Sequence, residues 1–164
     1  MDRPELDESF RKALLGEDEL GMVLRAHIHI EASLNELLDL VIPVPEHLPS
    51  LRYRQRVELA CAMGLKPQYR PALIVLGEIR NAFAHKLDSQ LSEERITKLY
   101  QAFAVEDREL LQASYEGTKS RMLVEKGPSL SDLSPRDRFV IMALVLKSVL
   151  VAAVFTLKKK YGNA

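Results

Sequence analysis

The sequence predicts an all-α fold, a single-domain helical bundle of about five helices. Its 164 residues suffice for one ordinary domain, and the 47% that are hydrophobic can bury a core. Apolar side chains recur at spacings of three and four in several segments, and no segment alternates apolar and polar residues as a strand does. With seven Gly and eight Pro, the composition excludes a chain whose main state is disordered.

The first two helices are expected on either side of a proline-rich linker. From Asp18 to Ile42 the apolar residues share one helix face and no proline intervenes. Pro43 begins a run of prolines that ends this helix, since proline lacks a backbone N–H and restricts the residue before it. A second helix is expected from Leu51 to Met63, closed by Gly64 as its C-cap with Leu65 behind it.

A third and a fourth helix follow. The third begins after Pro71 and ends near His85, with an apolar stripe along one side. Ser92 is expected to be the N-cap of the fourth helix, which continues its helical spacing to Phe103. Leu91 and Ile96 flank this cap at the positions of a hydrophobic staple.

The rest of the chain is expected to be a long connection and one further helix. Residues from about Glu116 to Ser134 mix Gly, Ser, Lys and Pro without periodicity. Ser134 followed by Pro135 is typical of a helix start. The expected division is an acidic N-terminal segment (1–17), a helical core (18–112), a connecting loop (113–135) and an apolar C-terminal helix packing on the core (136–161).

The last helix is apolar enough to raise the question of a membrane anchor. Its side chains from Phe139 to Leu157 are almost all apolar, but Lys147 lies near the centre. A lysine at that depth costs about 2.5–3.5 kcal/mol on insertion scales. A core helix or a dimer helix explains the same pattern. We therefore expect no membrane association and a cytoplasmic location, with a tail anchor as the lesser alternative; the first ten residues also lack the features of a secretory signal.

The charges balance overall but are unevenly distributed. With 23 basic and 23 acidic residues, the net charge gives no reason to expect a nucleic-acid partner. Residues 51–86, however, carry seven basic and two acidic side chains, whereas residues 1–50 carry four and eleven. An anionic partner is expected at this middle segment, and a solvated surface with neutralising neighbours is the alternative. The candidate RNA-binding residues are Arg52, Arg54, Arg56, Lys66 and Arg70, with Tyr53 or Tyr69 available for base stacking.

The end of the third helix carries residues suited to catalysis. Asn81 and His85 are four residues apart and share a helix face, with Arg80 at its edge. A neutral His can accept a proton near pH 7, and an Arg can hold a phosphate through bidentate hydrogen bonds. With His85 as the general base on a ribose 2′-hydroxyl and Arg80 stabilising the phosphorane, RNA cleavage requires no metal. Glu31 and Asn35 of the first helix are candidate supporting residues. The alternative is that the cluster serves helix packing alone.

A homodimer is expected to be part of this mechanism. One copy of the motif provides a base but no general acid for the leaving oxygen. Two copies across a twofold axis provide two His and two Arg side chains. Gly77 and Ala84 on the adjoining surface are small, so another helix, or a symmetry mate, can approach closely there.

No metal and no cofactor are expected. Cys61 is the only cysteine, which excludes an internal disulfide framework and a multi-cysteine metal site. His27 and Glu31 share a helix face, but His29 points to the other side and cannot join them. The sequence has neither a Gly-rich phosphate loop nor a dinucleotide fingerprint.

The motif resembles that of a known superfamily. Arg80-Asn81-Ala82-Phe83-Ala84-His85 is similar to the Arg-(four residues)-His signature, with a polar residue after the Arg, of the HEPN superfamily (higher eukaryotes and prokaryotes nucleotide-binding domains). The resemblance implies a helical bundle that dimerises around the motif helix. It also implies that Arg80 and His85 are the catalytic pair of a metal-independent ribonuclease, and that Asn81 supports them.

A wider set of residues, from about Leu20 to Phe103, carries a second resemblance. It consists of His27, Glu31, Asn35-Glu36-Leu37-Leu38, then Arg56-Val57-Glu58-Leu59-Ala60 before Gly64-Leu65, then the Arg80 to His85 helix. This order, and more weakly the last helix, resembles the mannitol operon repressor family. That family is helical, and its members are named as transcriptional regulators although they lack an evident helix-turn-helix. The present chain differs in its short acidic N-terminus and its complete Arg-Asn-His motif.

Two functions therefore remain open from the sequence. The first is a HEPN-like RNA-binding protein that is a metal-independent endoribonuclease of toxin or defence type. Its resemblance implies restraint by an antitoxin or another regulatory protein. The alternative is a non-catalytic regulator or protein-interaction module similar to the mannitol operon repressor family.

Overall fold

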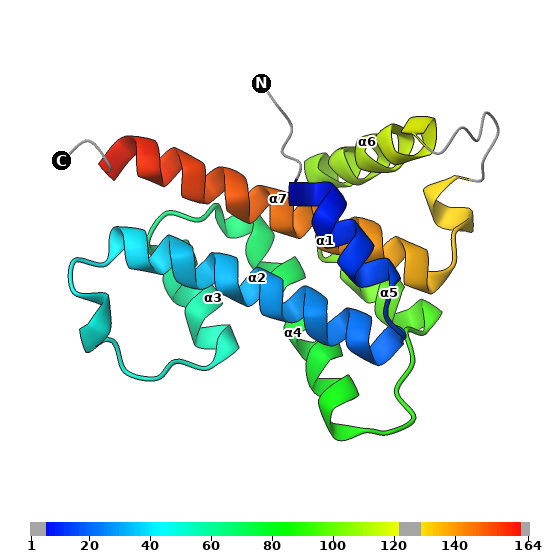
Figure 1. Cartoon of the computed structure of the whole chain (residues 1–164), viewed down its shortest axis with the longest axis horizontal. Helices are drawn as coiled ribbons and strands as arrows, with labels where there is room; N and C mark the ends of the chain where they lie inside the picture. Colours follow the sequence, from blue (N-terminus) through cyan, green and yellow to red (C-terminus); the bar gives the residue numbers. More distant parts are fainter. Residues whose placement is uncertain (1–5, 122–128, 162–164) are drawn as a thin grey trace.

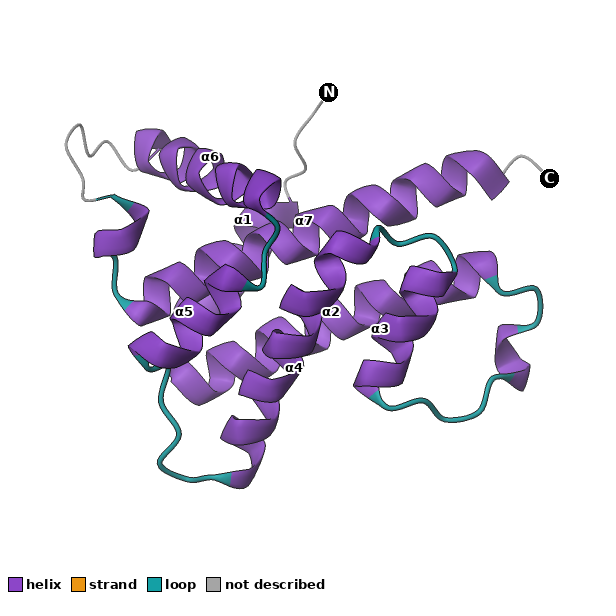
Figure 2. Ribbon diagram, turned by 180° about the vertical axis from the view of Figure 1, so that it is seen from behind, coloured by secondary structure: helices purple, strands orange, loops and turns teal. Residues whose placement is uncertain are grey.

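The computed structural model describes residues 6–121 and 129–161, and helices are the only regular elements in these two ranges (Figures 1 and 2). The all-α, single-domain bundle is confirmed, but the expected count of five helices is too low, because the described residues form seven α-helices. These are α1 (Leu6–Leu15), α2 (Glu19–Val41), α3 (Tyr53–Ala62), α4 (Arg70–His85), α5 (Glu93–Gln101), α6 (Val105–Arg121) and α7 (Pro135–Tyr161), with short 3-10 helices at Pro45–His47, Pro67–Tyr69 and Leu130–Asp132.

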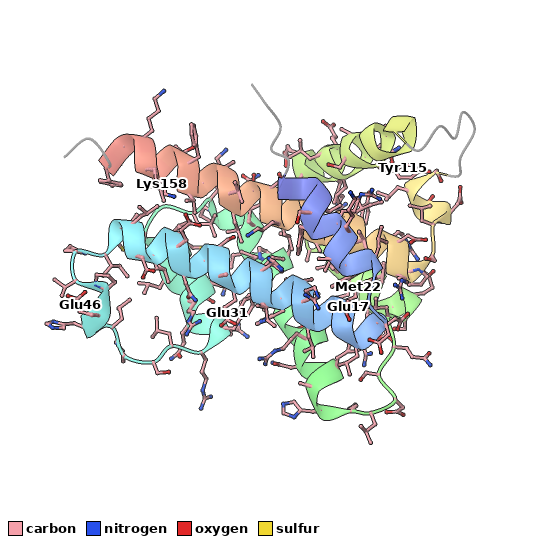
Figure 3. All side chains as sticks on the ribbon, viewed as in Figure 1. Glu17, Met22, Glu31, Glu46, Tyr115 and Lys158 are labelled. Atoms are coloured by element: carbon pink, nitrogen blue, oxygen red, sulfur yellow. The ribbon has the colours of Figure 1, made fainter. Side chains whose placement is uncertain are left out.

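Two long helices, α2 and α7, run side by side through the bundle in the same direction (Figure 1). Lys147 of α7 donates to Ser33 Oγ at 2.5 Å. Further along both helices, Lys158, which is labelled in Figure 3, donates to Glu36 at 2.7 Å. The other helices pack around this pair and bury its apolar faces.

The predicted helix ends are confirmed by their hydrogen bonds. The Asp18 and Ser92 side chains accept hydrogen bonds from the N–H groups of Gly21 and Arg95, so both residues are N-caps. Gly64 has φ +121°, a conformation that glycine adopts readily. The N–H of Leu65 then bonds the carbonyl of Ala60 at 2.9 Å, which completes a Schellman C-cap.

Two helices lie where none was expected. Helix α6 continues to Arg121, so the prediction of a connecting loop over 113–135 is wrong for residues 113–121. Its sequence has little amphipathic pattern, and it packs on the bundle through a few buried side chains such as Leu111 and Tyr115. The Leu130–Asp132 turn also lies in the expected loop, and residues 122–128 lie outside the described residues. Helix α1 lies within the acidic N-terminal segment, with Phe10 and Leu14 buried.

Helix α7 begins as predicted and is a core helix for most of its length. The Asp137 N–H donates to Ser134 Oγ at 3.1 Å, with Pro135 as the first helical residue. It is long and apolar enough to cross a membrane, and half of its most apolar stretch is buried within the protein. Lys147, the residue that argues against a span, bonds α2 inside the bundle. These contacts account for the buried half of the apolar stretch, and the cytoplasmic location remains a prediction.

Candidate functional site

The three motif residues lie on the surface at the C-terminal end of α4. The apolar side of this helix is buried, including Ile79 and Phe83. The opposite side carries Asn81 and His85, which are exposed, and Arg80, which is half-buried. Arg80 Nη1 donates to Asn81 Oδ1 at 3.0 Å. The arrangement on one face that the spacing predicts is therefore present.

The nearest carboxylates in the sequence are engaged elsewhere. Glu78 accepts from Lys98 at 2.7 Å, and Glu31 accepts from Arg56 at 2.8 Å. Within residues 6–121 and 129–161, no carboxylate forms an ion pair with Arg80, and no hydrogen bond occupies the His85 imidazole. The helix end is capped instead by the Lys86 N–H and the Ser89 hydroxyl, which both bond the Ala82 carbonyl. The motif side chains thus remain available to a ligand.

A buried histidine of α2 lies within the electrostatic reach of Arg80. His27 of α2 is 2% exposed, and its Nε2 has no hydrogen-bond partner. Burial, together with the positive charge of Arg80, lowers the pKa of His27 to about 4, so the imidazole is neutral at pH 7. Its Nδ1 lies 3.7 Å from Glu31 Oε2. The His27 side chain therefore does not offset the positive charge of Arg80, as an acidic side chain at that position would.

Tyr53 of α3 packs against both His27 of α2 and Gly77 of α4. Its ring centroid lies 4.3 Å from that of His27, and its hydroxyl donates to the Leu73 carbonyl at 3.0 Å. The ring packs against Gly77, which is buried. Gly77 does let another helix approach closely, as predicted, but that helix is α3 of the same chain. The prediction that Gly77 lies on the surface, where a symmetry mate could reach it, is wrong. The ring is likewise unavailable for base stacking in this structure.

The predicted RNA-binding residues fall into two groups. Arg52 and Lys66 are exposed. Arg56 is half-buried and pairs with Glu31. Arg70 holds Glu58 with two hydrogen bonds, one of them Nε to Oε2 at 2.6 Å, and this hydrogen bond lowers the pKa of the Glu58 carboxyl. Arg54 lies 4.0 Å from the same carboxylate.

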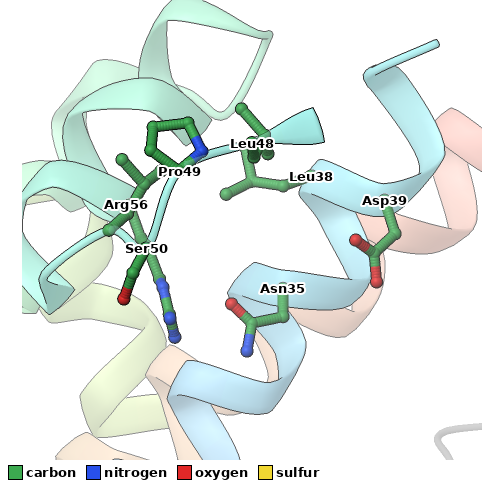
Figure 4. A pocket seen from close by; sticks show the side chains of 8 residues that line it. Asn35, Leu38, Asp39, Leu48, Pro49, Ser50 and Arg56 are labelled. Atoms are coloured by element: carbon green, nitrogen blue, oxygen red, sulfur yellow. The ribbon is translucent and has the colours of Figure 1, made fainter. Parts of the chain in front are cut away.

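The two predicted supporting residues take different positions. Glu31 lies between Arg56 and His27 and connects α3 to the region beneath Arg80. Asn35, one turn further along α2, lines an open pocket of about 260 Å³ against the 48–51 segment (Figure 4). Arg56 lines the same pocket and therefore contacts both the pocket and Glu31.

The remaining polar candidates do not form a site. His29 packs against the Phe10 ring at a centroid distance of 5.0 Å, away from the His27 side of α2. In the part of the chain that the structure describes, no group of three or more His, Cys, Asp or Glu residues is placed to hold a metal ion. Burial raises the pKa of the Cys61 thiol, which is the opposite of what an activated cysteine requires.

The chain matches no protein-family model, no curated protein and no solved structure.

Sequence reasoning missed three features of this region. It did not predict that His27 is buried and neutral, that Tyr53 packs between the helices, or that Asp39 lines the pocket. Asp39 lies at the i+4 position from Asn35, so the helical spacing of 31, 35 and 39 was the signal that could have found it.

Proposed function

We propose that this chain is a HEPN-like RNA-binding protein that cleaves RNA without a metal ion through Arg80 and His85. His85 acts as the general base on a ribose 2′-hydroxyl, and Arg80 stabilises the negative charge on the phosphorane. Asn81 orients the Arg80 guanidinium through their hydrogen bond. The products are a 2′,3′-cyclic phosphate and a 5′-hydroxyl end.

The observation that supports the proposal is that, among the described residues, no carboxylate pairs with Arg80 and no group hydrogen-bonds the His85 ring. A packing role would engage Arg80 with a carboxylate and His85 with a carbonyl. Glu78 and Glu31 instead bind Lys98 and Arg56. A half-buried guanidinium without an anionic partner, next to a neutral imidazole, is suited to an external phosphate.

A homodimer completes the proposed site. One copy of His85 removes a proton from the 2′-hydroxyl, and the leaving 5′-oxygen requires a proton from a second group. The second copy provides this group when the two α4 helix ends face each other across a twofold axis. Exposed Ala84, between Asn81 and His85, leaves room for that approach.

Cleavage of a single-stranded RNA in EDTA tests the proposal. We expect the wild type to cut and Arg80→Ala and His85→Ala to lose at least about 100-fold in rate, the range of one general-base contribution. His47→Ala is the matched control, because His47 is also exposed at a helix end. All variants should melt like the wild type, within about 0.5 kcal/mol in stability, because the side chains are on the surface. Equal cleavage by His85→Ala would refute the proposal.

A non-catalytic regulator or interaction module is the second candidate. The observation that favours it is the use of the basic residues: Arg54, Arg56 and Arg70 pair with Glu58 or Glu31, which reduces the positive field offered to RNA. A folded wild type that binds RNA weakly and cuts none would support this candidate. In either case a regulatory or antitoxin partner remains a proposal based on the resemblance.

A further inference from the structure

We propose that the pocket between α2 and the 48–51 segment binds a single guanine base of an RNA strand. The pocket has a volume of about 260 Å³ and is open on one side (Figure 4). This inference rests on the proposed RNA-binding function, but it concerns which base is recognised and not how the strand is cut.

Three of the polar side chains that line the pocket have no partner within the described part of the chain. No hydrogen bond or ion pair joins the side chains of Asn35, Asp39 or Ser50 to any other residue that the structure describes. Asn35 and Asp39 are successive turns of one helix face, so both reach the same opening. A concave site with several converging, unpaired polar groups is typical of a ligand pocket.

The donors and acceptors favour guanine among the four bases. An ionised carboxylate only accepts hydrogen bonds, and it accepts two parallel ones best. On its Watson–Crick edge, only guanine presents two adjacent donors, N1–H and the N2 amino group, which match the Asp39 carboxylate. The Asn35 amide can then donate to guanine O6. Adenine, cytosine and uracil each place an acceptor where Asp39 requires a donor.

The walls of the pocket suit a flat aromatic ring. Leu38, Leu48 and Pro49 provide apolar contact on one side (Figure 4). Arg56 also lines the pocket, beside Pro49 and Ser50 in Figure 4, and is held by its ion pair with Glu31. A guanidinium fixed in this way can contact the base or the adjoining phosphate.

The pocket is connected to the motif helix along one face of α2. His27, Glu31, Asn35 and Asp39 follow one another at intervals of four residues, and the positive charge of Arg80 acts on His27 at one end of this row. From residue 27 to residue 35 the helix rises about 12 Å. A strand that places a guanine in the pocket therefore has its neighbouring nucleotides near Arg80.

Binding titrations followed by NMR test this assignment on the full chain. The probes are the pentanucleotides UUGUU and UUAUU, and the mononucleotides GMP and AMP. We expect UUGUU to bind at least about tenfold more tightly than UUAUU, with shift changes at the amides of Asn35, Asp39 and Ser50. Asp39→Asn should abolish the preference, and Glu109→Gln, an exposed carboxylate on α6, should retain it.

Three results would overturn the assignment to this pocket: equal affinity for the two pentanucleotides, shift changes outside the pocket, or an Asp39→Asn variant that keeps the preference. A fourth, GMP binding as tightly as UUGUU, would overturn the RNA strand as the ligand and point to a free nucleotide. The binding test involves no cleavage. If the chain binds guanine but cuts no RNA, the guanine pocket is supported and the proposed nuclease function is refuted. If it cuts RNA but shows no base preference, the nuclease function is supported and the guanine pocket is refuted.

Discussion

The ring of Tyr53 lies directly over Gly77, in the space that any larger residue at position 77 would fill. A Cβ built on Gly77 would lie 2.7 Å from both Cδ1 and Cε1 of Tyr53, closer than real Cβ contacts allow. The ring is itself fixed, because its hydroxyl bonds the Leu73 carbonyl and the ring contacts that of His27 at a tilt of 47°. Gly77 therefore allows α3 and α4 to pack together beneath the motif.

We expect Gly77→Ala to destabilise the protein by about 1–3 kcal/mol, the usual effect of overpacking a core. This loss exceeds the gain of up to about 1 kcal/mol that alanine brings to a helix interior. Denaturant unfolding measures the change. Gly16→Ala is the control, because its added Cβ would lie 3.6 Å from the nearest atom, an ordinary contact. A Gly77→Ala variant as stable as the wild type would show that Tyr53 can move aside.

Local signals in the sequence predicted most helix boundaries but not how the helices pack. Ser92, Ser134–Pro135 and Gly64–Leu65 act through hydrogen bonds within a few residues, so their effect can be read from spacing. Helix α6 was missed because its sequence has little amphipathic pattern, so spacing gave no signal for it. The same reason applies to Gly77, since spacing does not tell which aromatic ring from another helix fills the adjacent space.

The stability of the protein should fall in mild acid because of His27. Its pKa is about 4 in the folded protein against 6.5 for the free side chain, owing to burial and to the charge of Arg80. The unfolded chain therefore binds a proton that the folded chain does not between these values. The free energy of unfolding should decrease as the pH falls below about 6.5 and this contribution should level out below about 4. Glu31 and Tyr53 also face the ring, but neither replaces the missing partner of Nε2.

Denaturant unfolding of the wild type and of His27→Gln at a series of pH values measures this effect. The variant lacks the titrating group, so the difference in stability between pH 7 and pH 4.5 should be smaller in it than in the wild type. His47→Gln, at an exposed position, should retain the wild-type dependence. Identical pH profiles for His27→Gln and the wild type would contradict the assignment of a neutral, buried His27.

If two copies of His85 act together, mixed dimers should be inactive. Wild type and His85→Ala, mixed in equal amounts and allowed to exchange subunits, would leave about one quarter of the dimers with two intact sites. The cleavage rate should then fall to about a quarter of that of the same total amount of wild type. A fall to one half would mean that each copy acts alone. Co-purification of untagged wild type with an affinity-tagged His85→Ala subunit must show that the subunits have exchanged.

The attack by a ribose 2′-hydroxyl is the step on which the proposed function depends, and one comparison measures it directly. A single-stranded RNA and the same strand with one 2′-deoxy nucleotide at the cleaved position are incubated with the wild type in EDTA. The account predicts that the RNA is cut to a 2′,3′-cyclic phosphate end and that the substituted strand is not cut at that position. No cleavage of the RNA, or equal cleavage of both strands, would contradict it.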